Sequence, residues 1–362
     1  MVAGIRDVAR LAGVSTATVT RALRDELSVT DATKAKVREA ARRLDYVPSA
    51  AARALSRGRS NLLGLFVPDI TNPFYAQVAQ GLEDRAAQAR YHCVIASSHL
   101  NPERERHLLT SFQDGTLAGL AATTVGTDER FTAALGATQG PLVLVDRRPR
   151  GIKAPLVRTD NRKVTRGAIG ELLDMGHQRV AMISGPRDFD TACQRLSGFR
   201  LAYRDAGLGL PDEYIRHGHL GEEGGFRAMN ELLALDPRPT AVFCFNNLVT
   251  VGALKAIRQA GLRIPTDISL LAFDDMTLFP LVEPPISAID QPAYEMGRCA
   301  ADLLLRMLDG EQGLGDVVLP AKMIIRGSMA PPGAPPNPTP PDGSRAVPSS
   351  RRADTEQPAG RN

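Results

Sequence analysis

Polar residues follow two apolar runs of this 362-residue chain in an arrangement that could support chemistry. Asn246 and Asn247 end the first run, 241–245, and Asp274 and Asp275 end the second, 268–273. Two adjacent carboxylates could exchange a proton with a substrate, and two amides could bind its polar groups. Neither pair has a nucleophile or a metal-ligand cluster near it in the sequence. We therefore favour ligand binding over catalysis at these positions.

Recognisable catalytic motifs are not found in the sequence. It contains no G-x-G-x-x-G after a predicted strand, no Walker loop, no H-E-x-x-H and no G-x-S-x-G. His177 lies just past a predicted helix end, where a histidine more often caps carbonyl groups than catalyses. The four cysteines are scattered without a C-x-x-C pair, and we expect buried, reduced thiols. We expect no enzymatic activity, no cofactor and no metal.

Hydrogen bonding to DNA bases is the chemistry that residues 13–23 favour. Gly13 permits a tight turn, Ser15 can cap the helix that follows, and Val19 and Leu23 share one apolar face. The other faces carry small or polar side chains, namely Thr16, Ala17, Thr18 and Arg21. A helix of this kind can enter a DNA major groove.

Two further helices are predicted beside this one. Residues 5–12 place apolar side chains at helical spacing, and a third helix begins near Thr30, with Lys34 among the charged residues expected on its outer sides. Together they form a helix-turn-helix module. Residues 1–60 hold twelve Lys and Arg against six Asp and Glu, a net charge of +6, so the remainder carries −2 of the total of +4. The basic module favours a nucleic-acid partner.

An alanine-rich segment follows Pro48 and ends near Gly58. Its helix propensity is high, but it is short enough to be marginal alone. It fits two interpretations equally well on composition. It could be an ordinary helical linker, or a helix that forms against DNA with Leu55 at a base step and Arg53, Arg57 and Arg59 near phosphates.

From residue 61, short apolar runs alternate with amphipathic stretches, as in parallel sheets covered on both faces. Strands are predicted at 62–67, 93–96, 119–123, 142–145, 180–183, 215–218, 241–245, 268–273, 317–319 and 323–326. Helices are predicted at 74–90, 102–114, 128–135, 162–175, 191–206, 222–235, 248–260 and 293–308. The alternation suits two doubly wound lobes, in which ligands bind at the carboxyl ends of the strands.

The composition of the remaining segments bears on localisation and order. After Met329 the chain is rich in proline and cannot bury a core, so we expect a disordered tail. No apolar run approaches the ~20 residues that a membrane span needs. Arg6, Asp7 and Arg10 interrupt any signal peptide. We expect a cytoplasmic protein without a membrane partner.

These residues together resemble the lac-repressor (LacI/GalR) family of bacterial transcription regulators from about Ile5 to about Ser328. The DNA-binding motif is carried by IRDVARLAGVS at 5–15, TVTR at 18–21 and YVP at 46–48. The body carries LFVPDITNPFY at 65–75, LVDR at 144–147, TDN at 159–161, GHQR at 176–179, RLSGF at 195–199 and FDD at 273–275. The resemblance is specific because these motifs occur in order over most of the chain.

The resemblance implies a small all-α helix-turn-helix domain plus an α/β two-lobed periplasmic-binding-protein-like domain. The expected boundaries are 1–48 for DNA binding, 49–60 for a hinge helix or linker, 61–328 for effector binding and dimerisation, and 329–362 for the disordered tail. The implied function is a ligand-responsive transcriptional regulator, favoured as a repressor, that binds a palindromic operator as a homodimer. A sugar-binding solute protein without DNA function is the alternative, and the basic module counts against it.

In the family, Thr16 and Ala17 match the positions that vary most with operator sequence, and Arg21 matches a base-contacting position. A phosphate contact is the alternative for Arg21. Leu55 matches a leucine that wedges into the minor groove at the operator centre, with a core leucine as the alternative. The expected DNA-binding residues are Ser15, Thr16, Ala17, Thr18, Thr20, Arg21, Arg53, Leu55 and Arg57.

The resemblance also implies an effector, a sugar or related metabolite, in the cleft between the lobes. Phe74 and Tyr75 match positions that stack on the ligand. Asp146 matches a polar cleft position, although a structural acid between strands is nearly as well supported. The other matching polar positions are Arg195, Asn246, Asp274 and, more weakly, Gln291.

Three positions depart from the family pattern. Asp45 stands where a glycine is usual, and aspartate tolerates a left-handed backbone less well than glycine does. Asn247 stands where an aspartate is usual, so one charge at the cleft edge is missing. The tail has no leucine heptads, which argues against a tetramerising coiled coil.

Overall fold

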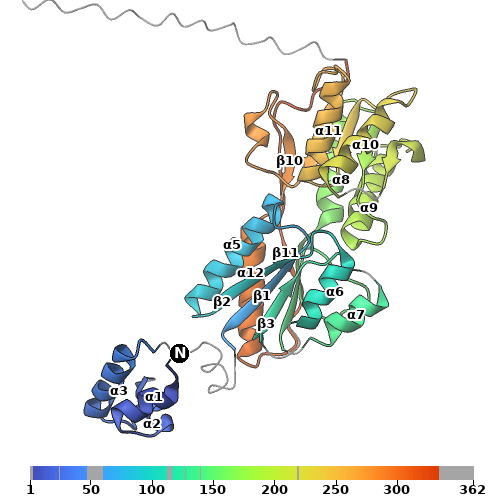
Figure 1. The fold of residues 1–362 in the computed structure, drawn as a ribbon. Helices are drawn as coiled ribbons and strands as arrows, with labels where there is room; N and C mark the ends of the chain where they lie inside the picture. Colours follow the sequence, from blue (N-terminus) through green and yellow to red (C-terminus); the bar gives the residue numbers. More distant parts are fainter. Residues whose placement is uncertain are drawn as a thin grey trace, which may run out of the picture. The chain divides into compact units, whose positions relative to one another are not determined.

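A computed structural model describes residues 3–23, 25–46, 60–111, 116–126, 128–138, 140–217 and 220–333 (Figure 1). The chain divides into two compact units, and each is described by itself. Unit 1 comprises residues 1–161, 187–194 and 291–322, and unit 2 comprises residues 162–186, 195–290 and 323–362.

The N-terminal part of unit 1 is the predicted three-helix module. Its helices are α1 (Ile5–Ala12), α2 (Thr16–Leu23) and α3 (Asp31–Arg43). Gly13 ends α1 with φ 67°, a left-handed conformation that glycine adopts without a Cβ clash. The three helices share one small apolar core, which contains Val8, Val19, Ala22 and Val37.

Lys34 was predicted on an outer side of α3, and this prediction is wrong. Only 7% of the residue is exposed. Its ammonium lies 3.1 Å from Asp25 Oδ1, and Arg38 Nη2 lies 2.9 Å from the same oxygen. The hydrogen bond from Lys34 lowers the pKa of Asp25 below its usual range. These ion pairs connect the segment after α2 to α3. Lys34 therefore stabilises the module internally.

Asp45 has φ 47°, which is a left-handed backbone conformation. It stands at the position where the family pattern has a glycine. We expect Asp45→Gly to raise the free energy of unfolding of the module by about 1 kcal/mol, since glycine relieves the Cβ clash but loses more entropy on folding. The measurement is thermal unfolding of the full chain followed by circular dichroism. Glu39→Gly, in the helical backbone of α3, is the matched control and should destabilise by about 1 kcal/mol. A lower free energy of unfolding for Asp45→Gly than for wild type would show that the backbone at Asp45 is not strained.

Unit 1 contains a six-stranded sheet in the order β11-β5-β4-β3-β1-β2, with parallel pairing at each step. Its strands are β1 (Leu62–Val67), β2 (His92–Ser97), β3 (Gly119–Ala122), β4 (Leu142–Val145), β5 (Leu156–Thr159) and β11 (Val317–Leu319). The helices are α5 (Pro73–Gln88), α6 (Pro102–Ser111), α7 (Glu129–Gly136) and α12 (Ala293–Leu308).

Alternate residues of β1 enter two different cores. Leu63 and Leu65 pack in the core that contains α5 and α12, whereas Phe66 packs in the core that contains Leu109 of α6 and Phe131 of α7. The sheet is therefore buried on both faces, which explains the nearly continuous apolar sequence of its central strands.

Unit 2 contains a second six-stranded sheet in the order β12-β10-β9-β8-β6-β7. Its strands are β6 (Val180–Ile183), β7 (Ile215–Arg216), β8 (Ala241–Cys244), β9 (Ser269–Phe273), β10 (Ser287–Asp290) and β12 (Lys322–Ile324). The helices wholly or mainly in unit 2 are α8 (Asn161–Asp174), α9 (Asp190–Asp205), α10 (Glu222–Leu233) and α11 (Asn247–Gln259), with 3-10 turns η1 (Asp212–Tyr214) and η2 (Phe279–Leu281). The two sheets confirm the predicted doubly wound α/β fold.

The segment after β12 is fixed to unit 2 by buried hydrogen bonds. Ser328 Oγ donates to the carbonyl of Leu270 at 2.6 Å and accepts the N–H of Ser287 at 2.8 Å. Ala330 N–H donates to Ser269 Oγ at 3.1 Å. Unit 2 thus continues past residue 328, into residues that were predicted to belong to the disordered tail. Residues 334–362 of that tail lie outside the described residues.

Candidate functional site

Helix α2 has a buried apolar side and a short, exposed side that carries small and polar residues. Val19 and Ala22 are fully buried, whereas Ser15, Thr16, Ala17 and Arg21 are exposed. Ser15 Oγ accepts the N–H of Thr18 at 3.1 Å, which confirms the predicted N-cap. This arrangement positions Thr16, Ala17 and Arg21 for an external partner.

The hydroxyls of Thr18 and Thr20 are used partly within the helix. Thr20 Oγ1 donates to the carbonyl of Thr16 at 3.0 Å, and the hydroxyls of Ser15 and Thr18 lie 2.9 Å apart. The donor of Thr20 is therefore engaged, and its oxygen can still accept a hydrogen bond. Arg21 is the long donor on this surface, with a planar group suited to the O6 and N7 atoms of guanine. The other three residues expected to contact DNA, Arg53, Leu55 and Arg57, lie outside the described residues.

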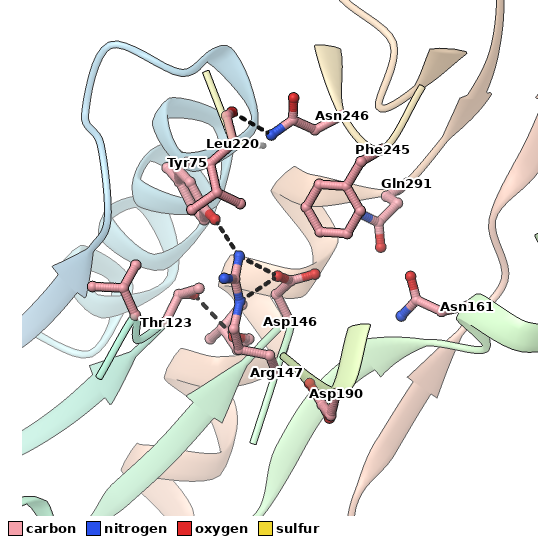
Figure 2. A network of polar contacts seen from close by, with 12 residues as sticks. Tyr75, Thr123, Asp146, Arg147, Asn161, Asp190, Leu220, Phe245, Asn246 and Gln291 are labelled. Carbon is pink, nitrogen blue, oxygen red and sulfur yellow. Dashed lines mark hydrogen bonds and ion pairs between the residues drawn. The ribbon is translucent and has the colours of Figure 1, made fainter. Parts of the chain in front are cut away.

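Unit 1 holds a buried polar network at the carboxyl end of β4 (Figure 2). Asp146 directly follows β4 with φ 71°, and its N–H donates to the carbonyl of Val157 at 2.8 Å. Arg147 Nε donates to Asp146 Oδ2 at 3.2 Å, and Arg147 Nη2 donates to the Tyr75 hydroxyl at 2.8 Å. The structure thus brings two predicted residues, Tyr75 and Asp146, together through an arginine that was not among them. Arg147 lies in the LVDR motif, which was the available indication.

Asp190 is a second residue of this network that was not predicted from the sequence. It begins α9, and its Oδ2 accepts the N–H of Arg148 at 3.4 Å. Its Oδ1 and Arg147 Nη1 are buried atoms without hydrogen-bond partners in the described part of the chain. Burial, followed by the negative charge of Asp146, raises the pKa of Asp190 above its usual range. Nothing in the sequence around Asp190 indicates this position, because its neighbours are more than forty residues away.

Phe74 and Gln291 are the other predicted effector residues of unit 1. Phe74 packs edge-on against Tyr75 with ring centroids 5.1 Å apart, and both side chains are only 6% exposed. Gln291 Oε1 accepts the hydroxyl of Thr159 at 2.5 Å, at the end of β5. The carbonyl of Thr159 accepts a hydrogen bond from Asn161 Nδ2 at 3.4 Å, so polar groups of three residues from two segments meet there.

Three predicted effector residues lie in unit 2, with Arg195 in α9, Asn246 after β8 and Asp274 directly after β9. Arg195 is 2% exposed, donates to the carbonyl of Phe245 and lies 3.4 Å from the centroid of the Phe273 ring. Asp274 is buried with φ 66°. Asn246 caps α11 by accepting the N–H of Val249 at 2.8 Å, and its amide nitrogen donates to the carbonyl of Leu220 at 2.9 Å. Asn246 therefore has a structural role in unit 2.

The two aspartates considered as a carboxylate pair have separate surroundings. Asp275 forms a two-point ion pair with Arg326, at 2.9 and 2.6 Å, and Arg326 also donates to the carbonyl of Ile286. Asp275 thus has a structural role, and the paired-carboxylate interpretation is wrong. Within the described ranges no three acidic, His or Cys side chains group as metal ligands. None of the described helices combines the length and hydropathy that a membrane span requires.

His177 is buried and joins three segments of unit 2. Its Nε2 lies 2.9 Å from the carbonyl of Ala330, and its Nδ1 lies 2.9 Å from Thr240 Oγ1. A carbonyl can only accept, so Nε2 carries the proton and Nδ1 accepts from the threonine. Burial lowers the pKa of His177. The histidine binds a carbonyl, as expected, but that carbonyl is 153 residues away rather than at the preceding helix end.

Glu105 of α6 is a buried acid that fixes the loop after β3. It is 2% exposed, and its carboxylate accepts the N–H groups of Val125, at 3.0 Å, and Gly126, at 2.8 Å. In the same loop, Thr123 Oγ1 donates to the carbonyl of Val145, the residue before Asp146. Burial raises the pKa of Glu105 to about 7, while its two backbone hydrogen bonds act in the opposite direction.

This pKa makes stability depend on pH. In the unfolded chain, Glu105 has already lost its proton at pH 6. In the folded chain, Glu105 loses its proton between pH 6 and pH 8. The free energy of unfolding therefore falls as the pH rises over this range. The expected fall is about 1.4 kcal/mol. We expect Glu105→Gln to remove this pH-dependent part of the free energy of unfolding. The measurement is urea unfolding of wild type and variant at each pH, compared as their free energies of unfolding. Glu103→Gln, an exposed acid on the same helix, is the control. Equal slopes for wild type and Glu105→Gln would refute the assignment.

Comparison with known proteins gives matches over most of the chain. Residues 4–49 match the family described as bacterial regulatory proteins, lacI family, and residues 169–329 match the periplasmic binding protein-like domain. The HTH-type transcriptional repressor CytR of Escherichia coli (strain K12) is 34% identical over 333 residues, covering 90% of this chain and 96% of the relative. The ribose operon repressor of the same strain is 34% identical over 307 residues, covering 84% and 93%. The crystal structure of the lac repressor dimer bound to operator and the anti-inducer ONPF matches with a TM-score of 0.80 and 26% identity, covering 91% of this chain and 100% of that chain.

Proposed function

The chain belongs to the lacI family of bacterial regulatory proteins, and from this premise we propose that α2 reads operator bases while the polar network around Arg147 binds the effector. The protein is a ligand-responsive, sequence-specific transcriptional regulator and not an enzyme. The relatives named above are repressors, which supports repression as its action. The observation that carries the DNA-binding part is the exposed face of α2, where Thr16, Ala17 and Arg21 lie on a buried anchor.

We propose that two copies bind one operator, as in the lac repressor dimer named above. Each α2 would then enter a major groove of one half-site, so the operator would be palindromic. Residues 1–48 would supply base contacts, with Ser15 and Thr18 beside the groove, and residues 49–60 would join them to the body. A solute-binding protein without DNA function is disfavoured, because the described module at 3–46 has the helix arrangement of a DNA reader.

Effector contacts are proposed from side chains in the segments that follow strands in each unit. In unit 1 these are Phe74, Tyr75, Asp146 and Gln291, with Arg147 and Asp190 added by the structure. In unit 2 they are Arg195, Asn246 and Asp274, of which Arg195 and Asp274 are favoured as ligand contacts. We propose that effector contacts come from these residues, with Asn246 holding the fold of unit 2 rather than the ligand, and that effector binding changes operator affinity through a shift between two states.

The test begins with the full-length protein and random double-stranded DNA. Rounds of selection should enrich a palindrome, and a gel-shift titration on that palindrome should give stronger binding than on shuffled DNA. Small molecules are then screened for those that change the affinity. Failure to enrich any sequence would refute operator recognition, and the absence of any active small molecule would refute the effector part.

Leu55 lies outside the described residues, and its role is proposed from the family match. If it wedges into the minor groove at the operator centre, Leu55→Ala should weaken binding to the selected operator roughly tenfold, or about 1.4 kcal/mol, because the kink loses its apolar support. The measurement is a gel-shift titration. Leu27→Ala, a fully exposed leucine in the module, is the control and should change affinity little. Unchanged affinity of Leu55→Ala would argue for the ordinary linker instead.

A further inference from the structure

The chain leaves α2 through a left-handed residue that is not glycine. Asp25 has φ 60°, a backbone conformation that is less favourable for a residue with a Cβ than for glycine. The N–H of Asp25 donates to the carbonyl of Ala22 at 3.2 Å. The N–H of Glu26 donates to the carbonyl of Arg21 at 3.1 Å. This is the hydrogen-bond pattern with which a left-handed residue closes a helix, so Asp25 fixes the last turn of α2.

Helix α3 holds Asp25 in this conformation. Lys34 Nζ lies 3.1 Å from Asp25 Oδ1 and also donates to the backbone carbonyl of Asp25 at 3.3 Å. Arg38 Nη2 donates to the same carboxylate oxygen at 2.9 Å. The other acid near Lys34 is Asp31, which is exposed and more distant at 3.8 Å. Both the side chain and the backbone of Asp25 are thus attached to α3, which maintains its unfavourable backbone conformation.

The short length of α2 makes this attachment important for Arg21. The helix has eight residues, a length at which a helix is marginal alone and frays at its ends. The Ser15 hydroxyl caps its first turn, and the turn at Asp25 closes its last turn, which carries Arg21. Two parallel hydrogen bonds to one guanine edge require a fixed guanidinium. A frayed last turn would distribute Arg21 over several positions and weaken base discrimination.

We propose that Asp25, held by Lys34 and Arg38, is a positioning residue that fixes Arg21 for operator reading. Asp25 acts through the last turn of α2 and not by contacting a base. This inference rests on the proposed function, because it requires α2 to read the operator through Arg21.

The experiment is a gel-shift titration of the full-length protein on the selected palindrome and on shuffled DNA. The readout is the ratio of the two affinities, because loss of one negative charge strengthens the attraction to the phosphates of both DNAs alike. Asp25→Asn removes the carboxylate charge, and asparagine tolerates the left-handed backbone. We expect this variant to lower the ratio about fivefold. Glu39→Gln removes the same charge from an exposed position on α3 and should leave the ratio unchanged. An unchanged ratio for Asp25→Asn overturns the inference.

Asp25→Gly separates the ion pairs from the backbone conformation. Glycine adopts a φ near that of Asp25 without a Cβ clash, so this variant keeps the turn while it lacks the carboxylate. We expect the ratio to fall as it does for Asp25→Asn, because the turn is no longer attached to α3. A wild-type ratio for Asp25→Gly would show that the turn alone positions Arg21, and it would overturn the role of the ion pairs.

A double-mutant cycle with Arg21→Ala distinguishes positioning from a general loss of stability. If Asp25 acts through Arg21, Asp25→Asn should change the ratio by less than about twofold once Arg21 is replaced by alanine. Thr30→Ala is the control for stability, because it removes the hydroxyl that caps α3 by accepting the N–H of Thr33. It should lower the thermal stability of the module without changing the ratio. An equal effect of Asp25→Asn with and without Arg21, or a Thr30→Ala effect as large as that of Asp25→Asn, would assign Asp25 a merely structural role.

Failure of this inference can be told apart from failure of the proposed function. If Arg21→Ala lowers the ratio but neither Asp25 variant does, Arg21 still reads the operator and only the positioning role fails. If Arg21→Ala leaves the ratio unchanged, base reading by Arg21 and this inference fail together. If selection enriches no sequence, operator recognition itself fails, and the inference fails with it.

Discussion

Arg147→Met should destabilise unit 1 by about 3–5 kcal/mol, because it leaves the Asp146 carboxylate buried without its cation. Asp146 is 4% exposed, and its Oδ2 lies 3.1 Å from Arg147 Nη2. The hydrogen bond from Arg147 Nη2 to the Tyr75 hydroxyl is lost in the same variant. Methionine keeps most of the aliphatic volume, so the loss of charge dominates over cavity formation. The measurement is urea unfolding at pH 7.5, with the unfolding of unit 1 followed by hydrogen exchange in β4.

A double variant gives the matched control. Arg147→Met combined with Asp146→Asn removes both charges, and replacement of a whole buried pair is often close to neutral. We therefore expect the double variant to recover most of the lost stability but not the effector response. If the single and the double variant unfold at the same urea concentration, the ion pair does not stabilise unit 1 in the way the geometry indicates. If the double variant still responds to the effector, Arg147 is not a ligand contact.

Long amphipathic or apolar stretches were predictable from the sequence alone. The predicted bounds of β1, β4, β6, β11 and α12 agree with the structure. These segments carry their own periodicity, so local reasoning suffices. The strands β5 and β10 were missed, because Arg158 interrupts one and Ser287 and Asp290 bound the other. Both are strands because neighbouring strands pair with them, as Leu156 does with Leu144 and Ala288 with Ala272.

Glycines inside helices show a second limit of local reasoning. A Cβ at Gly81 of α5 would lie 1.9 Å from the carbonyl oxygen of Tyr294, and one at Gly297 of α12 would lie 2.0 Å from that of Val78. The two helices therefore cross with their backbones in contact. Unit 2 repeats the device at Gly225 of α10 and Gly252 of α11. In the sequence such glycines only weaken a helix prediction, since their use depends on a partner helix far along the chain.

The candidate site was predictable where the chain carries a motif and not where tertiary structure assembles it. Tyr75 and Asp146 were identified from family motifs, and the structure joins them. Arg147 lay in such a motif without being selected, because sequence does not reveal which of two adjacent polar residues contacts a ligand. Asp190 comes to the network only because the chain returns to unit 1 at residues 187–194. No periodicity or spacing in a single sequence encodes that return.

Arg21→Ala should lower the affinity for the selected operator by about 1–3 kcal/mol while leaving binding to shuffled DNA almost unchanged. Arg21 is exposed in the last turn of α2, and its guanidinium can donate two parallel hydrogen bonds to one guanine edge. Thr16 and Ala17 have short side chains, and Thr20 has its donor engaged by the carbonyl of Thr16. Arg21 therefore supplies most of the donor capacity on this surface, and its loss should relax discrimination at one base pair in each half-site.

Gel-shift titrations at two salt concentrations separate this base contact from a phosphate contact. A base contact changes the ratio of operator to shuffled affinity and leaves the salt dependence of shuffled DNA almost intact, whereas a phosphate contact lowers both affinities together and reduces the salt slope. Lys36→Ala removes the same charge from an exposed position on α3 and is the matched control. It should leave the operator ratio unchanged. Equal losses of Arg21→Ala on both DNAs, with a smaller salt slope, would assign Arg21 to a phosphate and transfer the base discrimination to Thr16, Ala17 and the bending of the operator centre.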